Sequence, residues 1–219
     1  MTAPPAARRP VPERPLPSRR MGAGREGFGS DATPLPPVTY LLIDGENLDS
    51  TLGGSVLGHR PSPEERPRWE RVVQFAGATY GQPVKTLFFL NASSGSMPMP
   101  FVQALLAIGV RPIALSGPST MKVVDVGIQR TLAAIVDRPG NVVLGSHDGD
   151  FEPQIASLLT GDRKVALLGF REFVSSKYAD HVAAGLEIFD LEEDAQSFNQ
   201  VLPRVRIIDI DQFDPVRFL

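Results

Sequence analysis

The chain contains no cysteine at all. This absence excludes a disulfide framework, a thiolate zinc site and catalysis by a cysteine nucleophile. The chain also lacks any apolar run of the roughly 20 residues that a membrane-spanning helix needs, and no hydrophobic stretch of the secretory type follows its basic N-terminus. We therefore expect a protein of the reducing cytoplasm that does not contact a membrane.

Charge is modest, with a formal net charge of −3, but it is unevenly distributed. Residues 1–37 hold six Arg and three acidic residues, so the rest of the chain is more acidic than the whole. An acidic body argues against a general nucleic-acid coat protein. It remains compatible with a nuclease, because clustered carboxylates bind divalent cations that reverse the local field.

Composition divides the chain into three parts. Residues 1–37 contain nine Pro and almost no large apolar side chains, which predicts a disordered tail. Residues 38–190 carry the regular pattern of a folded domain. Residues 191–219 form a C-terminal extension, in which 191–203 is polar and expected to be peripheral. The string RVRIIDI at 204–210 predicts either an extra edge strand or a contact in a homo-oligomer.

Apolar runs rich in strand-forming residues alternate with helical patterns in the central part of the chain. Strands are predicted at 38–43, 85–92, 110–115, 141–146, 164–170 and 185–190, and helices at 67–79, 97–109, 120–137, 151–160 and 175–183. Nearly continuous apolar strands separated by helices require a parallel sheet that is covered on both faces. The fold class is therefore α/β, a three-layer α/β/α Rossmann-like domain. The segment 50–67, rich in Gly and Pro, is expected to be a long polar loop.

Acidic side chains follow the first and the fourth predicted strands. Asp44 directly follows the first strand, and Asp148 and Asp150 follow the fourth. If the strand order is 3-2-1-4-5, these two strands are neighbours and their loops meet at the carboxyl edge of the sheet, where ligands bind in such folds. Asp125 lies near the start of the helix that precedes the fourth strand, so we expect it at the same edge.

Carboxylates that crowd together repel one another unless a cation lies between them. Hard oxygen ligands suit Mg²⁺ or Mn²⁺, and such an ion activates water and neutralises a scissile phosphate. The pattern therefore predicts phosphodiester hydrolysis. The structural alternative is that Asp148 and Asp150 cap the helix that begins at 151, since an Asp after a strand often forms a helix cap or an Asx turn.

Four strings occur in order over residues 43–180: IDGENL, KVVDVGIQRTL, SHDGDFEPQI and SSKYAD. As an ordered set they resemble the successive motifs of the NYN domain, a branch of the PIN-like nucleases. The resemblance implies a Rossmann-like PIN core, dependence on Mg²⁺ or Mn²⁺, and single-stranded RNA as substrate. It assigns the metal cluster to Asp44, Asp125, Asp148 and Asp150. It also places Asn47 where a polar side chain orients an acid or the substrate.

Three further residues are candidates for substrate binding. His147 departs from the family pattern, which more usually has Gly before the Asp, and its imidazole would narrow the phosphate approach or contact the phosphate. Lys122 precedes Asp125 by three positions, so it either binds a phosphate or forms an ion pair within the helix. Ser146 either forms a hydrogen bond inside its loop or binds a phosphate.

These observations predict a metal-dependent endoribonuclease that acts on single-stranded RNA. One alternative is a catalytically silent RNA-binding or regulatory module that uses the acids only for metal-bridged phosphate contact. Another is a small-molecule phosphohydrolase. Against the latter, no DxD pair follows the first strand, and the chain has no Gly-rich phosphate cradle.

Overall fold

The computed structural model describes residues 36–205, 208 and 210–219. The predicted disordered tail, 1–37, lies almost entirely outside the described residues. The predicted edge strand at 204–210 lies partly outside them, and its described residues belong to no strand. None of the helices in the described part of the chain has the length and apolar character required to span a bilayer.

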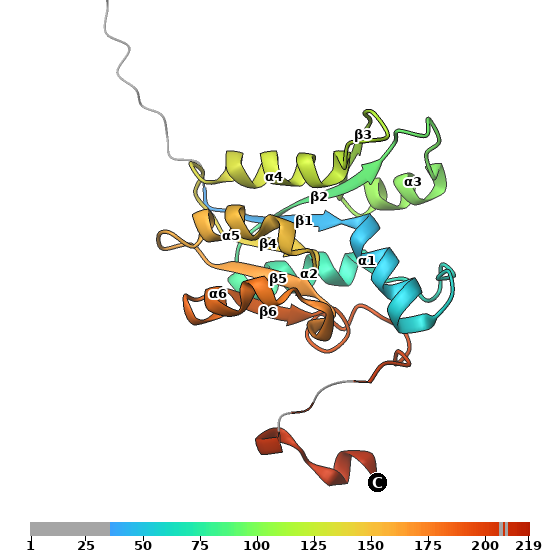
Figure 1. Ribbon diagram of the computed structural model, residues 1–219, viewed down its shortest axis with the longest axis vertical. Helices are drawn as coiled ribbons and strands as arrows, with labels where there is room; N and C mark the ends of the chain where they lie inside the picture. Colours follow the sequence, from blue (N-terminus) through green and yellow to red (C-terminus); the bar gives the residue numbers. More distant parts are fainter. Residues whose placement is uncertain (1–35, 206–207, 209) are drawn as a thin grey trace, which may run out of the picture. The chain divides into compact units, whose positions relative to one another are not determined.

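Strands and helices alternate along the chain, as Figure 1 shows. The strands are β1 (Thr39–Asp44), β2 (Val84–Asn91), β3 (Arg111–Leu115), β4 (Val142–Gly145), β5 (Val165–Gly169) and β6 (Glu187–Asp190). The helices are α1 (Gly45–Thr51), α2 (Trp69–Tyr80), α3 (Met99–Ala107), α4 (Val123–Ile135), α5 (Glu152–Leu158) and α6 (Ala179–Ala183). Short helical turns are η1 (Leu52–Leu57), η2 (Gly149–Phe151), η3 (Arg171–Phe173), η4 (Ser176–Tyr178), η5 (Ile210–Gln212) and η6 (Pro215–Phe218).

The six strands form one parallel sheet in the order β3-β2-β1-β4-β5-β6. This confirms the α/β class and the adjacency of the first and fourth strands that the site prediction required. The chain runs from β1 to β3 on one side and from β4 to β6 on the other, so the direction of winding reverses between β1 and β4. The carboxyl ends of β1 and β4 therefore form the switch point at which ligands bind in open α/β sheets.

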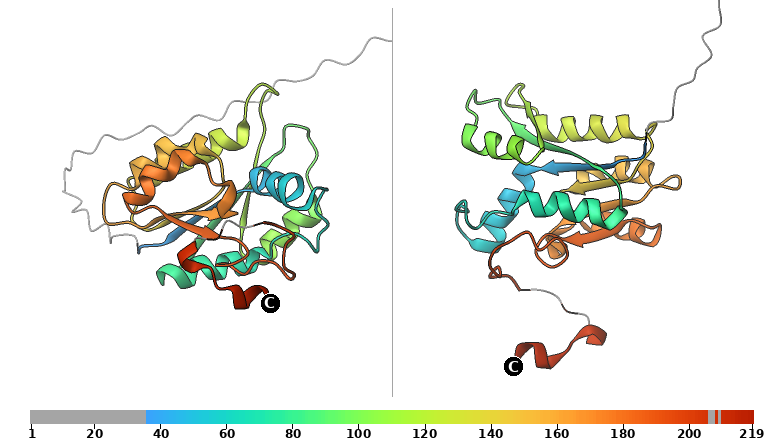
Figure 2. Two further views of the ribbon diagram at one scale, coloured as in Figure 1. Left: turned by 60° about the horizontal axis from the view of Figure 1, so that its bottom comes forward. Right: turned by 180° about the vertical axis from the view of Figure 1, so that it is seen from behind.

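Two separate cores cover the two faces of the sheet. Along β1, Leu41 and Ile43 point into the core that contains α1, α2 and α3. Tyr40 and Leu42 point into the core that contains α4 and α5. This alternation follows from the two-residue period of a strand. Figure 2 shows α2 on the opposite side of the sheet from α4 and α5, which gives the three layers.

The segment predicted as a polar loop, 50–67, is helical in its first part. α1 continues directly into the π-helical turn η1. Leu48, Leu52 and Val56 are spaced four residues apart and are all buried against the sheet. Burial of this apolar face outweighs the weak helix propensity of Gly in this segment, so the prediction was wrong for residues 50–57.

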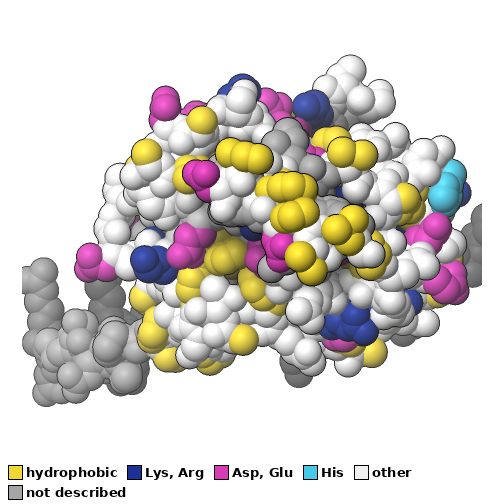
Figure 3. Space-filling view, turned by 90° about the horizontal axis from the view of Figure 1, so that it is seen from below, with side chains coloured by type: hydrophobic (Ala, Val, Ile, Leu, Met, Phe, Trp, Pro, Cys, Tyr) yellow, Lys and Arg dark blue, Asp and Glu magenta, His cyan; other side chains and the backbone are white. Residues whose placement is uncertain are grey.

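The C-terminal segment 191–204, called here the C-terminal strap, was expected to be peripheral. The structure instead buries Leu191, Phe198 and Leu202 in the same core as α2. Beyond the strap, the exposed apolar side chains are Val205, Ile208, Ile210, Phe213, Val216 and Leu219. Figure 3, which views the molecule from below, shows hydrophobic side chains gathered over the middle of that face, with acidic ones among them.

Candidate metal centre

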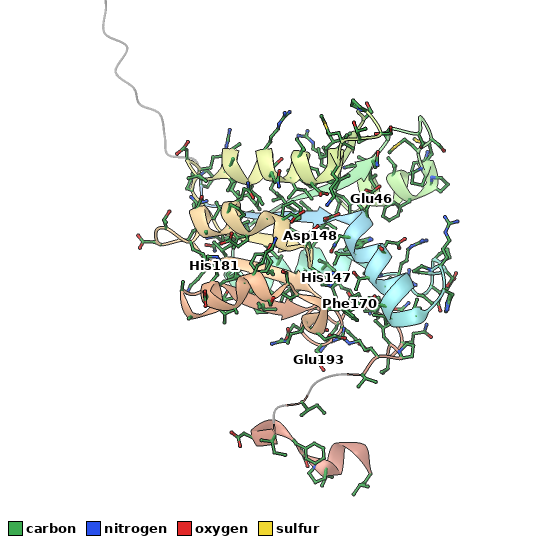
Figure 4. All side chains as sticks on the ribbon, in the orientation of Figure 1. Glu46, His147, Asp148, Phe170, His181 and Glu193 are labelled. Atoms are coloured by element: carbon green, nitrogen blue, oxygen red, sulfur yellow. The ribbon has the colours of Figure 1, made fainter. Side chains whose placement is uncertain are left out.

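The candidate site residues come from three segments that meet at the carboxyl edge of the sheet. Asp44 ends β1, the loop 146–150 follows β4, and Asp125 lies in the first turn of α4. Since β1 and β4 are hydrogen-bonded neighbours, their ends lie side by side. Figure 4 shows Asp148 at this edge.

Three carboxylates converge closely. Asp125, Asp148 and Asp150, called here the aspartate cluster, each offer an oxygen, and these oxygens all lie within 4.8 Å of one another. The Asp150 backbone N–H donates to Asp148 Oδ1 (2.9 Å), so the local turn holds two of the acids together. Asp148 thus forms the Asx-type turn anticipated as the structural alternative, and its carboxylate also faces the cluster.

Asp44 lies deeper than the aspartate cluster and is not one of its three mutually close groups. Its Oδ1 accepts from the Asn47 N–H (3.1 Å), and its Oδ2 accepts from Ser146 Oγ (3.2 Å). Burial raises the pKa of Asp44 to about 6, against the lowering effect of these two hydrogen bonds, and the negative charges of Asp125 and Glu46 raise the pKa further. The structure therefore places three of the four predicted acids together, and the fourth, Asp44, is electrostatically coupled to one of them, Asp125.

Two lysines provide positive charge at the aspartate cluster. Lys122 Nζ lies 3.4 Å from both Asp125 Oδ2 and Asp150 Oδ2. Lys177 Nζ lies 3.5 Å from Asp150 Oδ1. Hydrogen bonds and charge from Lys122 and then Lys177 lower the pKa of Asp150. The ion pair predicted between Lys122 and Asp125 is present, and Lys122 also bridges to a second acid.

His147 occupies a different environment from the one predicted. Its side chain is buried, and its N–H and ring Nδ1 both contact Asn47 Oδ1 (2.8 and 3.0 Å). Its Nε2 accepts the Phe170 N–H (2.7 Å), which leaves the proton on Nδ1. Burial lowers the pKa of His147 to about 4, so the ring is neutral. A substrate contact through this imidazole is inconsistent with the geometry, because both ring nitrogens bind the protein.

Ser146 and Asn47 position the loop and the buried acid. Ser146 Oγ donates to Asp44 and accepts the Asp148 N–H (3.2 Å). Asn47 uses its backbone for Asp44 and its side-chain oxygen for His147. The hydrogen bonds inside the loop that were one alternative for Ser146 are therefore present. The Asn47 side chain binds His147, and only the Asn47 backbone reaches an acid.

Sequence reasoning missed two side chains that hold the loop 146–150. Tyr178 Oη donates to Asp148 O (2.6 Å), and Gln129 Nε2 donates to Asp150 O (3.1 Å). A Cβ on Gly149 would lie 2.5 Å from Ser175 Oγ and 2.8 Å from Lys177 Cδ, so a larger residue there would have to displace these two side chains. Tyr178 and Ser175 belong to the SSKYAD string, and Gln129 lies one turn after Asp125, so the motif order and helical spacing contained this signal.

A groove of about 960 Å³ adjoins the site without including the aspartate cluster. Gly45 and Glu46, at the start of α1, line this groove together with apolar side chains such as Trp69. Arg60 and Arg68 also line it. The lining of the groove does not include Asp125, Asp148 or Asp150. The candidate metal site is therefore the aspartate cluster, and the groove is a separate surface beside that site.

The donor set fits a hard divalent cation. Carboxylate oxygens within 4.8 Å of one another are the ligands that Mg²⁺ and Mn²⁺ prefer. The ammonium groups of Lys122 and Lys177 occupy positions where positive charge is required. Asp125, Asp148 and Asp150 are therefore the residues that could hold such an ion, with Asp44 behind them.

A parallel α/β sheet with clustered acids at its switch point is the architecture of a PIN-like nuclease domain. The family model that matches the chain is the NYN domain, over residues 38–186, more than half of the sequence. The chain therefore belongs to the NYN domain family, and the resemblance stated from its motifs is confirmed. No curated protein matches the chain.

Proposed function

We propose that this protein is a metal-dependent ribonuclease that hydrolyses phosphodiester bonds of single-stranded RNA. The observation that carries the proposal is the convergence of Asp125, Asp148 and Asp150 from two distant segments, with the buried Asp44 beside them. Membership of the NYN family supports a nuclease and supports RNA as its substrate. A cytoplasmic location and self-association stay predictions from the sequence.

In this proposal the acidic side chains bind the metal ion, directly or by positioning its ligands. When bound, Mg²⁺ or Mn²⁺ would lower the pKa of a coordinated water and neutralise charge on the scissile phosphate. Asp148 and Asp150 would hold the ion directly, together with Asp125. The Asp44 carboxylate accepts hydrogen bonds from Asn47 and from Ser146 of the loop 146–150. In this proposal these bonds fix the position of the loop and of its carboxylates.

Lys122 and Lys177 have a second use in this proposal. Both side chains are more than half exposed and reach the rim of the aspartate cluster. With Asp150 holding a divalent cation, these ammonium groups would be available to bind the non-bridging oxygens of the RNA phosphate. Such contacts position the strand without selecting a base.

The test is a time course with labelled single- and double-stranded RNA and DNA in Mg²⁺, in Mn²⁺ and in excess chelator. Asp148→Asn should lower the cleavage rate by about 100-fold or more, because it removes a ligand from the reacting ion. Asp162→Asn is the matched control, since Asp162 is exposed in the turn before β5, at the other end of the strands. Undiminished cleavage by the Asp148 variant, or in chelator, contradicts the mechanism.

A catalytically silent RNA-binding module is the second candidate. The observation that favours it is the pairing of Lys122 and Lys177 with Asp150, which compensates part of the acidic charge without an ion. This candidate predicts RNA binding in Mg²⁺ with no product after long incubation. The same time course, combined with a binding measurement on the same RNA, separates the two.

A further inference from the structure

The C-terminal strap lies beyond residues 38–186, the region that the NYN family model matches. It is nevertheless fixed to the domain by directional bonds. The Leu191 N–H donates to Gly169 O (2.8 Å), and Arg71 Nη1 donates to Phe198 O (3.0 Å). This chain therefore has an ordered feature next to β5 that membership of the family does not explain.

The strap ends in a buried ion cluster centred on Arg204, whose side chain is only 3% exposed. Its Nη2 pairs with Asp190 Oδ2, and its Nε lies 3.2 Å from Glu172 Oε1 and 3.5 Å from Glu192 Oε2. Asp190 Oδ2 also accepts the Arg171 N–H (3.1 Å). Arg204 with Asp190, Glu172 and Glu192 is called here the arginine cluster. Among the described residues Arg204 Nε and Nη1 form no hydrogen bond, so the ion pairs, above all the one with Asp190, hold the buried guanidinium in place.

A continuous set of contacts leads from Arg204 to the candidate metal centre. The Arg204 Cζ lies 5.1 Å from the centroid of the Phe170 ring. Phe170 stacks on His147 at 5.7 Å and 13°, and its N–H donates to His147 Nε2. His147 donates to Asn47 Oδ1, and the Asn47 N–H donates to Asp44 Oδ1. Figure 4 shows Phe170, His147 and Asp148 in succession along this edge.

We infer that Arg204 is a positioning residue for the metal centre: it holds Phe170 against His147 and thereby keeps Asn47 and Asp44 in the geometry that binds the cation. The buried, neutral His147 is then a rigid spacer between the strap and the acids. The inference rests on the proposed function, because the geometry matters only if a cation binds there. It extends the functional unit of this chain past the matched domain to the strap.

The experiment compares Arg204→Met and Arg204→Lys with the wild-type full-length chain. Binding of Mn²⁺ alone is measured by electron paramagnetic resonance, and kcat and KM for RNA are measured separately. Loss of support behind a metal ligand weakens metal binding or turnover by about 10-fold or more. For Arg204→Met we expect a loss of this size in Mn²⁺ affinity and in kcat, with a KM for RNA within about twofold of the wild-type value. Arg204→Lys keeps the charge and should restore part of both.

A second measurement does not depend on metal or on turnover. The His147 Nδ1–H is buried and bound to Asn47, so its proton should exchange slowly with solvent in NMR spectra of the metal-free chain. Arg204→Met should speed this exchange. Arg163→Met is the matched control, because the Arg163 guanidinium is likewise held by three groups, here backbone carbonyls, but at the far end of α4.

The outcomes separate the two proposals. If wild-type protein binds Mn²⁺ but cleaves no RNA, the nuclease proposal fails, and Mn²⁺ affinity with proton exchange still decides the role of Arg204. Unchanged Mn²⁺ affinity and exchange in both Arg204 variants overturn the inference. Equal losses in Arg163→Met also overturn it, because the effect would then be one of general stability. If Arg204→Met does not fold, Arg204→Lys is compared with wild type in its place, with a smaller loss of Mn²⁺ affinity and a smaller rise in proton exchange expected.

Discussion

The aspartate cluster and the arginine cluster each contain three carboxylates, but they differ in the source of their positive charge. In the arginine cluster a guanidinium that is 3% exposed lies among the acids. In the aspartate cluster the nearest cations are Lys122 and Lys177, whose side chains are 70% and 60% exposed. An arginine buried in this way is a permanent part of the fold, whereas exposed lysines are readily displaced. The first cluster is therefore built for stability and the second is open to a divalent ion.

The largest difference between the clusters should appear in the free energy of unfolding. Asp190→Asn weakens the pairing of a buried guanidinium, and we expect a loss of about 3 kcal/mol. Asp148→Asn removes one of several repelling charges at a part-exposed site, and we expect a change within about 0.5 kcal/mol. Denaturant titrations in chelator measure both. Equal losses in the two variants would show that the aspartate cluster is also a structural ion network.

The next effect is the response to divalent cations. At a Mn²⁺ concentration 100 times Kd, the wild-type chain should gain about 2.7 kcal/mol of stability, because the ion binds the folded state. The gain should vanish in Asp148→Asn and persist in the Asp162→Asn control. Thermal melts at several Mn²⁺ concentrations test this. A gain that survives the Asp148 change means that the ion binds elsewhere.

A smaller effect concerns pH in the metal-free protein. Burial raises the pKa of Asp44 from 3.8 to about 6. Between pH 3.8 and pH 6, Asp44 therefore holds a proton in the folded state and has lost it in the unfolded chain. The Asp44 contribution to stability therefore rises as pH falls from 7 to 5, by about 1 kcal/mol, and is lost as pH rises through 6. Asp44→Asn should be more stable than wild type at pH 7, and the difference should shrink by pH 5. A constant difference across this range contradicts the assignment.

The smallest effect should come from the exposed lysines. Lys177→Ala should change the free energy of unfolding by less than about 0.5 kcal/mol, since exposed ion pairs contribute little. It should weaken RNA binding at low salt and reduce the salt dependence of that binding, because one phosphate contact is lost. Binding titrations at several salt concentrations measure this. The exposed Lys164, which lies before β5, supplies the comparison Lys164→Ala.

Much of the architecture could be predicted because it depends on local pattern. The apolar runs at β1 and β4 and the glycine and proline signals between helices indicate a covered parallel sheet, and right-handed connections leave few strand orders. Asp44 ends β1 and Asp148 lies in the loop after β4, so their meeting at one edge followed from the strand order. The helical segment over 45–57 was missed because its glycines suggested a loop, although Leu48, Leu52 and Val56 form an apolar face that is buried in the core.

The environments of individual side chains could not be predicted in the same way. His147 follows a strand, as a substrate-binding residue would, but whether its ring turns outward depends on the space beside Gly169, where a Cβ would lie 2.7 Å from the ring. The strap shows no helical or strand period, so its polar composition suggested a peripheral segment. Its few large side chains, such as Phe198, are buried only because a hydrophobic surface is available beside α2 and β5.

By itself the sequence determined the α/β class, the family and the set of acids at the switch point, because these depend on residue type and order along the chain. Only the tertiary structure decided that Asp44 is buried deeper than the other three acids, that His147 is buried between Asn47 and Phe170, and that Arg204, outside the matched domain, packs on Phe170. Those facts depend on contacts between residues more than 20 positions apart. Such contacts are set by packing, which composition and periodicity do not encode.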